Sequence, residues 1–147
     1  MTETEHRVAE LPLLSVLPQI HGLVMSCADL RSYGFTKSQL IVFAALAHCG
    51  RLRMAQVAAY LSSSKEQATR SVAQLVDDGY VAREQGADNR TMVYIQLTDK
   101  GRELLDRWRV EFRSRLAARL DARLTPGEQE ELARSLYSLL CLLDKVV

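Results

Sequence analysis

A change of hydrophobic period in the middle of the chain constrains its fold more than any other feature. Apolar residues recur at helical spacing over residues 54–61, and a second helical pattern runs from about residue 64 to residue 78. A serine-rich turn at residues 62–64 separates the two patterns. Over residues 91–97 apolar side chains alternate instead, which is typical of a strand. Two closely linked helices followed by a hairpin predict a winged helix-turn-helix.

Helix caps predict the other boundaries of the central segment. Thr36 and Gln39 have the spacing of a capping box, which predicts a helix that starts there and stops near Gly50. Thr98 is positioned to cap a long helix. Residues 125–128 repeat the capping-box pattern, with a proline in the first turn of the helix that follows.

Long apolar helices are predicted on both sides of this segment. Residues 11–31 have helical period, although Pro18 should kink the helix or delay its start. The helices that follow residues 98 and 125 carry leucine-rich stripes. A small winged domain cannot bury all these faces, so we expect an obligate, two-fold symmetric homodimer. The alternative is a monomer whose terminal helices pack on one another.

The sequence therefore predicts a mainly α-helical protein with a small β wing, organised in three parts. Residues 1–35 form an N-terminal dimerisation helix, residues 36–98 the winged helix-turn-helix, and residues 99–147 the C-terminal dimerisation helices. The length of 147 residues is that of one ordinary domain, and 48% hydrophobic with 25% charged residues is typical of a globular protein.

Composition and residue spacing argue against several classes of protein. No apolar run is long enough to span a membrane, and the polar N-terminus does not resemble a signal peptide, so we expect a cytoplasmic protein. Cys27, Cys49 and Cys141 are widely spaced in apolar surroundings, which favours buried, reduced thiols. Metal-ligand spacing, a phosphate loop and a nucleophile–base pair are all lacking in the sequence, so no metal, cofactor or enzymatic activity is expected.

The order of the predicted elements and five sequence stretches resemble the MarR (multiple antibiotic resistance regulator) family of bacterial transcription factors. The resemblance covers nearly the whole chain, and its specificity lies in the joint order and spacing of the stretches. One departure lies in the wing, where Glu84 follows Arg83 although family members often have two adjacent basic residues there. The stretches are FTKSQL at 35–40, MAQVAAYL at 54–61, SKEQATR at 64–70 with GYV at 79–81, DNR at 88–90 and LTDKGR at 97–102.

This resemblance implies a transcriptional regulator, which we expect to be a repressor, that binds double-stranded DNA as a homodimer. Each subunit would place its recognition helix in the major groove of an inverted-repeat operator, and its wing would reach the flanking minor groove. The resemblance also implies release by a small phenolic or anionic ligand, held in a cleft between the dimer helices and the winged domain. Conceivable lining residues, each equally compatible with ordinary core packing, are His21, Met25, Tyr33, Phe43, His48, Trp108 and Phe112.

The predicted recognition helix carries side chains that can read DNA. If its apolar residues face the core, Lys65, Thr69 and Arg70 lie on the opposite surface, with Gln67 and Gln74 near its edges. Arg70 can pair with a guanine edge, and glutamine can pair with adenine. The alternative is an ordinary solvated helix face. The net charge of +1 does not decide between them, because only the contact surface of a DNA-binding protein needs to be basic.

The other predicted DNA contacts lie at the start of this helix and in the wing. Ser63 and Ser64, either of which can be the N-cap, are suited to phosphate because a helix N-terminus attracts anions. Arg83 is expected to neutralise a phosphate, and Arg90 to enter a narrow minor groove. Asp88 would hold Arg90 in position or pin the turn of the wing, as the family resemblance implies.

Two other functions stay open at this point. The first is a redox-sensing regulator that acts through a cysteine, although Cys27 lies toward the end of the first helix and the sensing cysteine of family members lies near its start. The second is a winged-helix module that binds proteins without specific DNA binding. Steep loss of affinity with salt would distinguish a DNA-binding protein from such a module.

Overall fold

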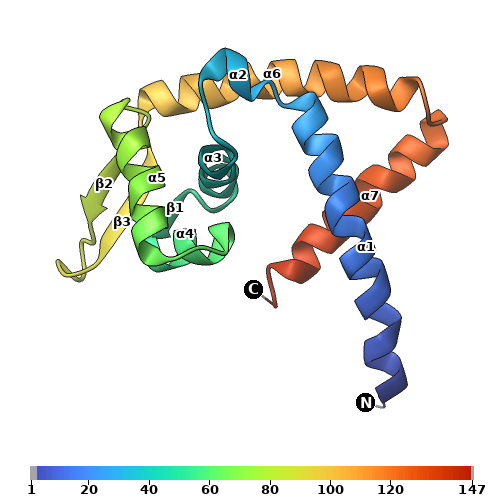
Figure 1. Ribbon diagram of the computed structural model, residues 1–147, viewed down its shortest axis with the longest axis horizontal. Helices are drawn as coiled ribbons and strands as arrows, with labels where there is room; N and C mark the ends of the chain where they lie inside the picture. Colours follow the sequence, from blue (N-terminus) through green and yellow to red (C-terminus); the bar gives the residue numbers. More distant parts are fainter. Residues whose placement is uncertain (1–2, 147) are drawn as a thin grey trace. The chain divides into compact units, whose positions relative to one another are not determined.

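A computed structural model describes residues 3–146 of the chain, and the side chains of residues 12–146. The chain divides into two compact units, and the boundary between them falls between Val110 and Glu111, inside helix α6. Within residues 3–146, no helix combines the length and the apolarity that crossing a membrane requires. The elements in chain order are α1 (Glu3–Cys27), α2 (Leu30–Tyr33), α3 (Lys37–Cys49), β1 (Arg51–Arg53), α4 (Met54–Leu61), α5 (Lys65–Asp77), β2 (Val81–Gln85), β3 (Val93–Leu97), α6 (Asp99–Asp121) and α7 (Pro126–Leu143) (Figure 1).

The first helix is longer at its N-terminal end than the sequence predicted. α1 begins well before residue 11 and continues through both Pro12 and Pro18. The expectation that Pro18 delays the helix is therefore wrong: a proline removes one backbone N–H, and the other hydrogen bonds of a 25-residue helix remain. The first helix was predicted to continue to about residue 31, but the chain forms a separate short helix there, α2. Asp29 caps α2 by accepting hydrogen bonds from the Ser32 N–H and hydroxyl.

Side-chain caps fix the starts of three helices as predicted. Thr36 Oγ1 accepts a hydrogen bond from the Gln39 N–H at 3.2 Å, and Gln39 Oε1 accepts one from the Thr36 N–H at 2.8 Å. Thr98 Oγ1 accepts a backbone N–H from the first turn of α6 at 3.1 Å. Thr125 and Glu128 form the same reciprocal cap on α7. Hydrogen bonds from the backbone and the hydroxyl of Thr125 lower the pKa of the Glu128 carboxyl.

A three-stranded antiparallel sheet, in the order β1–β3–β2, completes the winged domain. The hairpin of β2 and β3 confirms the prediction, but β1 was not predicted. This strand has three residues and one apolar side chain, Leu52, so it is too short to show an alternating pattern. Leu52 pairs with Ile95 across the sheet and is 1% exposed, so β1 contributes directly to the core.

The core of the winged domain forms around α5. This helix packs against α3, α4 and β2 (Figure 1). Its Ala68, Val72 and Leu75 are completely buried, which confirms the predicted inner face. On β3, Ile95 is buried as predicted, whereas Val93 is exposed because it lies at the wing end of the strand. The other buried members of this core are Val42, Phe43, Ala45, Leu46, Leu52, Val57, Val81, Leu97, Leu104 and Leu105.

Gly101, in the first turn of α6, lies directly against the backbone of Tyr80. A Cβ atom at position 101 would lie 2.1 Å from the Tyr80 carbonyl oxygen and 3.0 Å from its carbonyl carbon. Because backbone atoms cannot give way as a flexible side chain does, Gly101→Ala should lower the free energy of unfolding by about 1–3 kcal/mol or more, as measured by urea unfolding. Gly127→Ala, in the first turn of α7 with nothing within 4 Å of the added Cβ, is the matched control. Equal effects of the two substitutions would contradict this account.

Candidate nucleic-acid interface

The turn between α4 and α5 sets the direction in which α5 continues after α4. Ser62 ends α4 in the left-handed backbone region, at φ 47°. The N–H groups of Ser62 and Ser63 donate to carbonyl oxygens in the last turn of α4, both at 3.1 Å. Of the two predicted capping residues, Ser64 is the N-cap, because its Oγ accepts the Gln67 N–H at 3.2 Å. The other N–H groups in the first turn of α5 are those of a helix N-terminus, which attracts anions.

The exposed face of α5 carries five of the predicted DNA contacts. Lys65, Gln67 and Arg70 make no side-chain hydrogen bond or ion pair with the described residues. Thr69 is also exposed, but its hydroxyl donates to the Lys65 carbonyl oxygen at 2.7 Å. The Gln74 amide donates to a carboxylate one turn further along the helix, at 3.2 and 3.3 Å. Three of the five side chains are therefore available to a partner, and two already bond within their own helix and its C-cap.

One asparagine and two backbone hydrogen bonds hold the loop of the wing. The Gly86 N–H donates to the Met92 carbonyl oxygen at 2.7 Å, and the Met92 N–H donates to the Asn89 carbonyl oxygen at 3.0 Å. Asn89 Oδ1 accepts from the Thr91 N–H at 3.0 Å and from its hydroxyl at 2.6 Å. Sequence reasoning missed Asn89, although an asparagine in a turn commonly bonds the backbone two residues further on.

The charged side chains of the wing form no hydrogen bond or ion pair within the part of the chain that the structure describes. Asp88 and Arg90 are both exposed, and neither a hydrogen bond nor an ion pair joins them in the described part of the chain. Of the two roles considered for Asp88, Asn89 fills that of pinning the turn. Arg83 and Glu84 are both exposed on β2, where consecutive side chains point to opposite faces of the sheet, so the start of the wing carries one charge of each sign.

Contacts that the sequence did not predict join the end of α5 to the start of α6. Thr98 Oγ1 donates to the Gly79 carbonyl oxygen at 2.6 Å, and Lys100 Nζ donates to the Asp78 carbonyl oxygen at 2.7 Å. Lys100 Nζ also lies 4.6 Å from the centre of the Tyr80 ring, a cation–π contact. These residues (Asp78, Gly79, Tyr80, Thr98 and Lys100) are termed the α5–α6 clamp. The clamp connects the C-terminal end of α5, the candidate recognition helix, to the first turn of α6.

Two of the seven predicted ligand-lining residues share one apolar pocket. Phe43 and Trp108 line it together with Phe35 and other apolar side chains of α3 and α6. Tyr33 lies beside the pocket, because its ring stacks on that of Phe35 with centroids 6.4 Å apart. Phe43 also belongs to the buried core. His21, Met25 and His48 are not among the lining residues, and Phe112 lies beyond the unit boundary at Val110.

The three cysteines differ in exposure. Cys27 is buried as expected, whereas Cys49 and Cys141 are exposed, so the expectation of buried thiols is wrong for these two. Cys49 ends α3, and its Sγ lies 3.4 Å from the Tyr60 hydroxyl. Cys141 lies on α7, a helix none of whose residues is buried. Apolar neighbours in the sequence therefore did not predict burial at either position.

The chain is similar to known transcriptional regulators in sequence and in fold. A sequence profile described as the MarR family matches residues 33–90. An HTH-type transcriptional regulator of Bacillus subtilis (strain 168), YkoM, is 31% identical over 107 residues, which are 73% of this chain and 69% of that protein. The structure of the transcriptional regulator PA4135 has 25% identity and a TM-score of 0.70, and the match covers 94% of this chain and 96% of that one. NadR, solved in complex with 4-hydroxyphenylacetate, has 20% identity and a TM-score of 0.68, with 86% and 89% of the two chains covered.

Asn89→Ala removes the oxygen that accepts both hydrogen bonds from Thr91. Amide hydrogen exchange at Thr91, followed by NMR, should accelerate about fivefold or more, because a hydrogen bond is worth about 1 kcal/mol. Asp88→Ala is the matched control, since Asp88 makes no hydrogen bond in this turn. Acceleration of the same size in both variants would show that Asn89 does not hold the loop.

Proposed function

Because the chain belongs to the MarR family of transcriptional regulators, we propose that it binds double-stranded DNA as a homodimer and represses transcription. The observation that carries the proposal is the division of α5 into two faces. Its inner face is completely buried, and its outer face presents Lys65, Gln67 and Arg70, whose side chains bond to no residue among those that the structure describes. Both the family and the fold are those of transcriptional regulators rather than enzymes.

In this proposal α5 reads the major groove. Arg70 donates to a guanine edge through two hydrogen bonds, and Gln67 pairs with adenine. Lys65 contacts a phosphate near the start of the helix, where the hydroxyls of Ser63 and Ser64 and the first-turn N–H groups also face the backbone of the duplex. Thr69 and Gln74, whose polar groups already bond within α5 and its C-cap, contribute less.

The wing is proposed to reach the minor groove. Arg90 stands at the exposed tip of the loop, and a narrow minor groove attracts arginine because its negative potential is enhanced. Asp88 orients Arg90 once DNA draws the two side chains together. Arg83 neutralises a phosphate, and the adjacent Glu84 opposes that contact through its like charge with the DNA.

A second copy of the chain is proposed to cover the apolar faces of the terminal helices. On α7 the side chains of Leu136, Leu140 and Leu143 lie along one stripe and are exposed in the single chain. Leu13, Leu14 and Leu17 of α1 are more than half exposed. Contiguous apolar surface of this kind marks a protein interface. A two-fold symmetric dimer places two α5 helices on an inverted-repeat operator.

A small ligand is proposed to release the regulator from DNA. NadR is similar in fold and was solved with 4-hydroxyphenylacetate, a phenolic anion. In this chain the pocket lined by Phe43 and Trp108 is apolar, but its volume of about 10 Å³ is far smaller than an aromatic ring, so the proposal requires its lining side chains to move apart when the ligand binds. Tyr33 lies beside it.

The proposal is tested by selecting bound sequences from random duplex DNA with the full chain. The expected product is an inverted repeat with half-sites about one helical turn apart. On that site, at fixed salt, Arg70→Ala should weaken binding by about 1–3 kcal/mol and relax the preference at one base position, as measured by fluorescence anisotropy. Arg107→Ala, which removes an exposed arginine from α6, is the control and should bind as the parent does.

Salt dependence separates this function from a protein-interaction module. A DNA-binding dimer should lose affinity steeply as salt rises, because each phosphate contact releases counterions. A flat response, with no inverted repeat recovered from the selection, would contradict DNA binding and favour the interaction module.

The dimer is tested by sedimentation of the full chain. Leu140→Glu puts a charge into the proposed apolar interface and should shift the protein toward the monomer. Ser138→Glu is the matched control, because it lies on the opposite, polar face of α7 with Arg134 and Glu131. A dimer of equal strength in both variants would place the interface elsewhere.

A further inference from the structure

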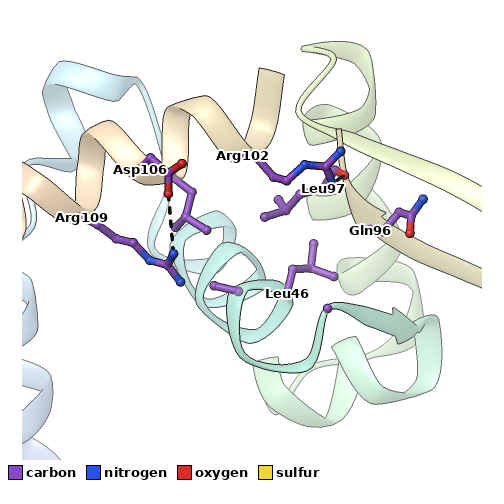
Figure 2. A pocket seen from close by; sticks show the side chains of 9 residues that line it. Leu46, Gln96, Leu97, Arg102, Asp106 and Arg109 are labelled. Carbon is purple, nitrogen blue, oxygen red and sulfur yellow. Dashed lines mark hydrogen bonds and ion pairs between the residues drawn. The ribbon is translucent and has the colours of Figure 1, made fainter. Parts of the chain in front are cut away.

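A cavity of about 290 Å³ opens on the winged-helix unit, between the end of α3, the end of β3 and the first turns of α6 (Figure 2). Leu46 and Leu105 contribute apolar side chains to its lining. Figure 2 shows Arg109 extending from α6 toward α3, whereas Arg102 turns toward the end of β3. The cavity is therefore an apolar hollow with cationic side chains of α6 beside it.

The two arginines of this cavity differ in what they already bind. Arg102 donates to the Leu97 carbonyl oxygen at 2.7 Å and to Asp99 Oδ1 at 2.6 Å, so it holds the junction between β3 and α6. Arg109 lies 3.7 Å from Asp106 Oδ1, which is beyond hydrogen-bond distance. About half of the Arg109 side chain is exposed, and its N–H groups donate to none of the described residues. Arg109 is therefore available to a partner.

The outer face of the sheet borders on this cavity. Leu52 of β1 points into the core, so Arg51 and Arg53 on either side of it lie on the outer face, where both are exposed. Tyr94 pairs with Arg53 across the sheet and lies on the same face. Gln96 lines the cavity and pairs with Arg51, so the cavity and the outer face share a border. We call the two together the sheet–cavity surface.

Arg51 is held over the ring of Tyr94. Its guanidinium carbon lies 4.5 Å from the centre of the ring, a cation–π contact. An arginine stacked in this way keeps its fork of N–H donors for a carboxylate. Neither Arg51 nor Arg53 forms an ion pair with the residues that the structure describes.

Cationic side chains outnumber acidic ones on the sheet–cavity surface. Four arginines and two carboxylates give it a net charge of +2. Asp106, the carboxylate nearest to Arg109, is 74% exposed, and an exposed pair of this kind is weak. The charged residues are Arg51, Arg53 and Glu84 on the outer face and Arg102, Asp106 and Arg109 at the cavity.

We propose that the sheet–cavity surface docks an acidic segment of another protein. One apolar side chain of that segment enters the cavity and contacts Leu46 and Leu105. Carboxylates on both sides of this anchor pair with Arg109 and with the two arginines of β1. Tyrosine and arginine are the residues that most often dominate the binding energy of protein interfaces, around an anchor that fills a pocket.

The surface suits a protein better than a nucleic acid. Phosphates would pair with the arginines, but they have no apolar group to fill the cavity, and Glu84 and Asp106 would repel them. The outer face also lies on the opposite side of the sheet from the core that contains the buried face of α5. This surface is separate from the one proposed for DNA, so its test needs no operator.

The test is selection of peptides from a random library displayed on phage, with the full chain as the target and no DNA present. The recovered peptides should share one apolar residue with aspartate or glutamate on both sides of it. The best of them, made as a labelled peptide, is the probe for fluorescence anisotropy at about 0.15 M salt. Replacing its apolar residue by alanine should weaken binding about tenfold or more, because the cavity is left unfilled.

Variants of the protein test the arginines. Arg109→Gln and Arg53→Gln should each weaken binding of this peptide about two- to fivefold, because each removes an exposed ion pair. Arg107→Gln, at an exposed position of α6 outside the cavity, is the matched control and should bind as the parent does. All three side chains are exposed or half exposed, so the variants should keep the parent's thermal transition.

NMR spectra locate the peptide. It should shift the amide signals of Ala47, Gly50 and Gln96, which line this cavity, more than those of Leu40 and Ala44, which line the apolar pocket. Signal shifts confined to the apolar pocket or to the terminal helices would overturn the proposal.

Three other results would also overturn it. The first is a selection that enriches no peptide, or only peptides without shared acidic residues. The second is parental affinity in the variant that carries both Arg109→Gln and Arg53→Gln. The third is displacement of the peptide by a random-sequence DNA duplex, retained in Arg70→Ala, which would assign these arginines to DNA. The first two results are obtained without DNA, so they are independent of whether the chain binds an operator.

Discussion

One face of α5 is completely removed from water, and the other features of the winged domain depend on that burial. Ala68, Val72 and Leu75 have no exposed surface, and fully burying a side chain such as Val or Leu contributes about 1.5–3 kcal/mol. The side chains that surround them come from α3, from α4 and from all three strands. Rotation of α5 about its axis would expose these residues, so the orientation of the polar face is set by the packing of the apolar one. Lys65 and Arg70 are held outward although their side chains make no hydrogen bond or ion pair with the described residues.

The same helix, α6, serves two different cavities with two of its faces. Leu104 and Trp108 line the apolar pocket, whereas Arg102, Asp106 and Arg109 line the charged one. Leu105 lies between them and contributes to both. A helix that repeats every 3.6 residues produces this division when charged residues recur three and four positions apart beside an apolar stripe. The chemistry of each cavity therefore follows from which stripe of α6 faces it.

Features with a local cause were predicted from the sequence, and features that join distant segments were not. The caps at Thr36, Thr98 and Thr125 follow from the identity of one residue and its neighbour three positions on. β1 is a strand only because Leu52 pairs with Ile95, more than 40 residues away, and three residues carry no period of their own.

The candidate site divides in the same way. The exposed face of α5 follows from its helical period, which is why the predicted outward residues are exposed. The hydrogen bond from Lys100 to the Asp78 carbonyl oxygen joins residues 22 positions apart in the sequence, so no local sequence pattern predicts it. The cavity beside Arg109 is formed by α6 together with the ends of α3 and β3, so it could be recognised only in the assembled fold. The exposure of Cys49 and Cys141 likewise depends on how whole helices pack.

The α5–α6 clamp lies where three segments of the chain come together: the end of α5, the end of β3 and the first turn of α6. The exit of α5 and the end of β3 are both fastened to the first turn of α6, by Thr98 and Lys100 on one side and by Arg102 on the other. Gly101 allows that turn to touch the backbone of Tyr80 with no side chain in between. The end of α5, the end of β3 and the start of α6 are therefore joined by direct hydrogen bonds. Because these bonds attach α5 and β3 to the same turn, a displacement of the first turn of α6 would be passed to both of them together.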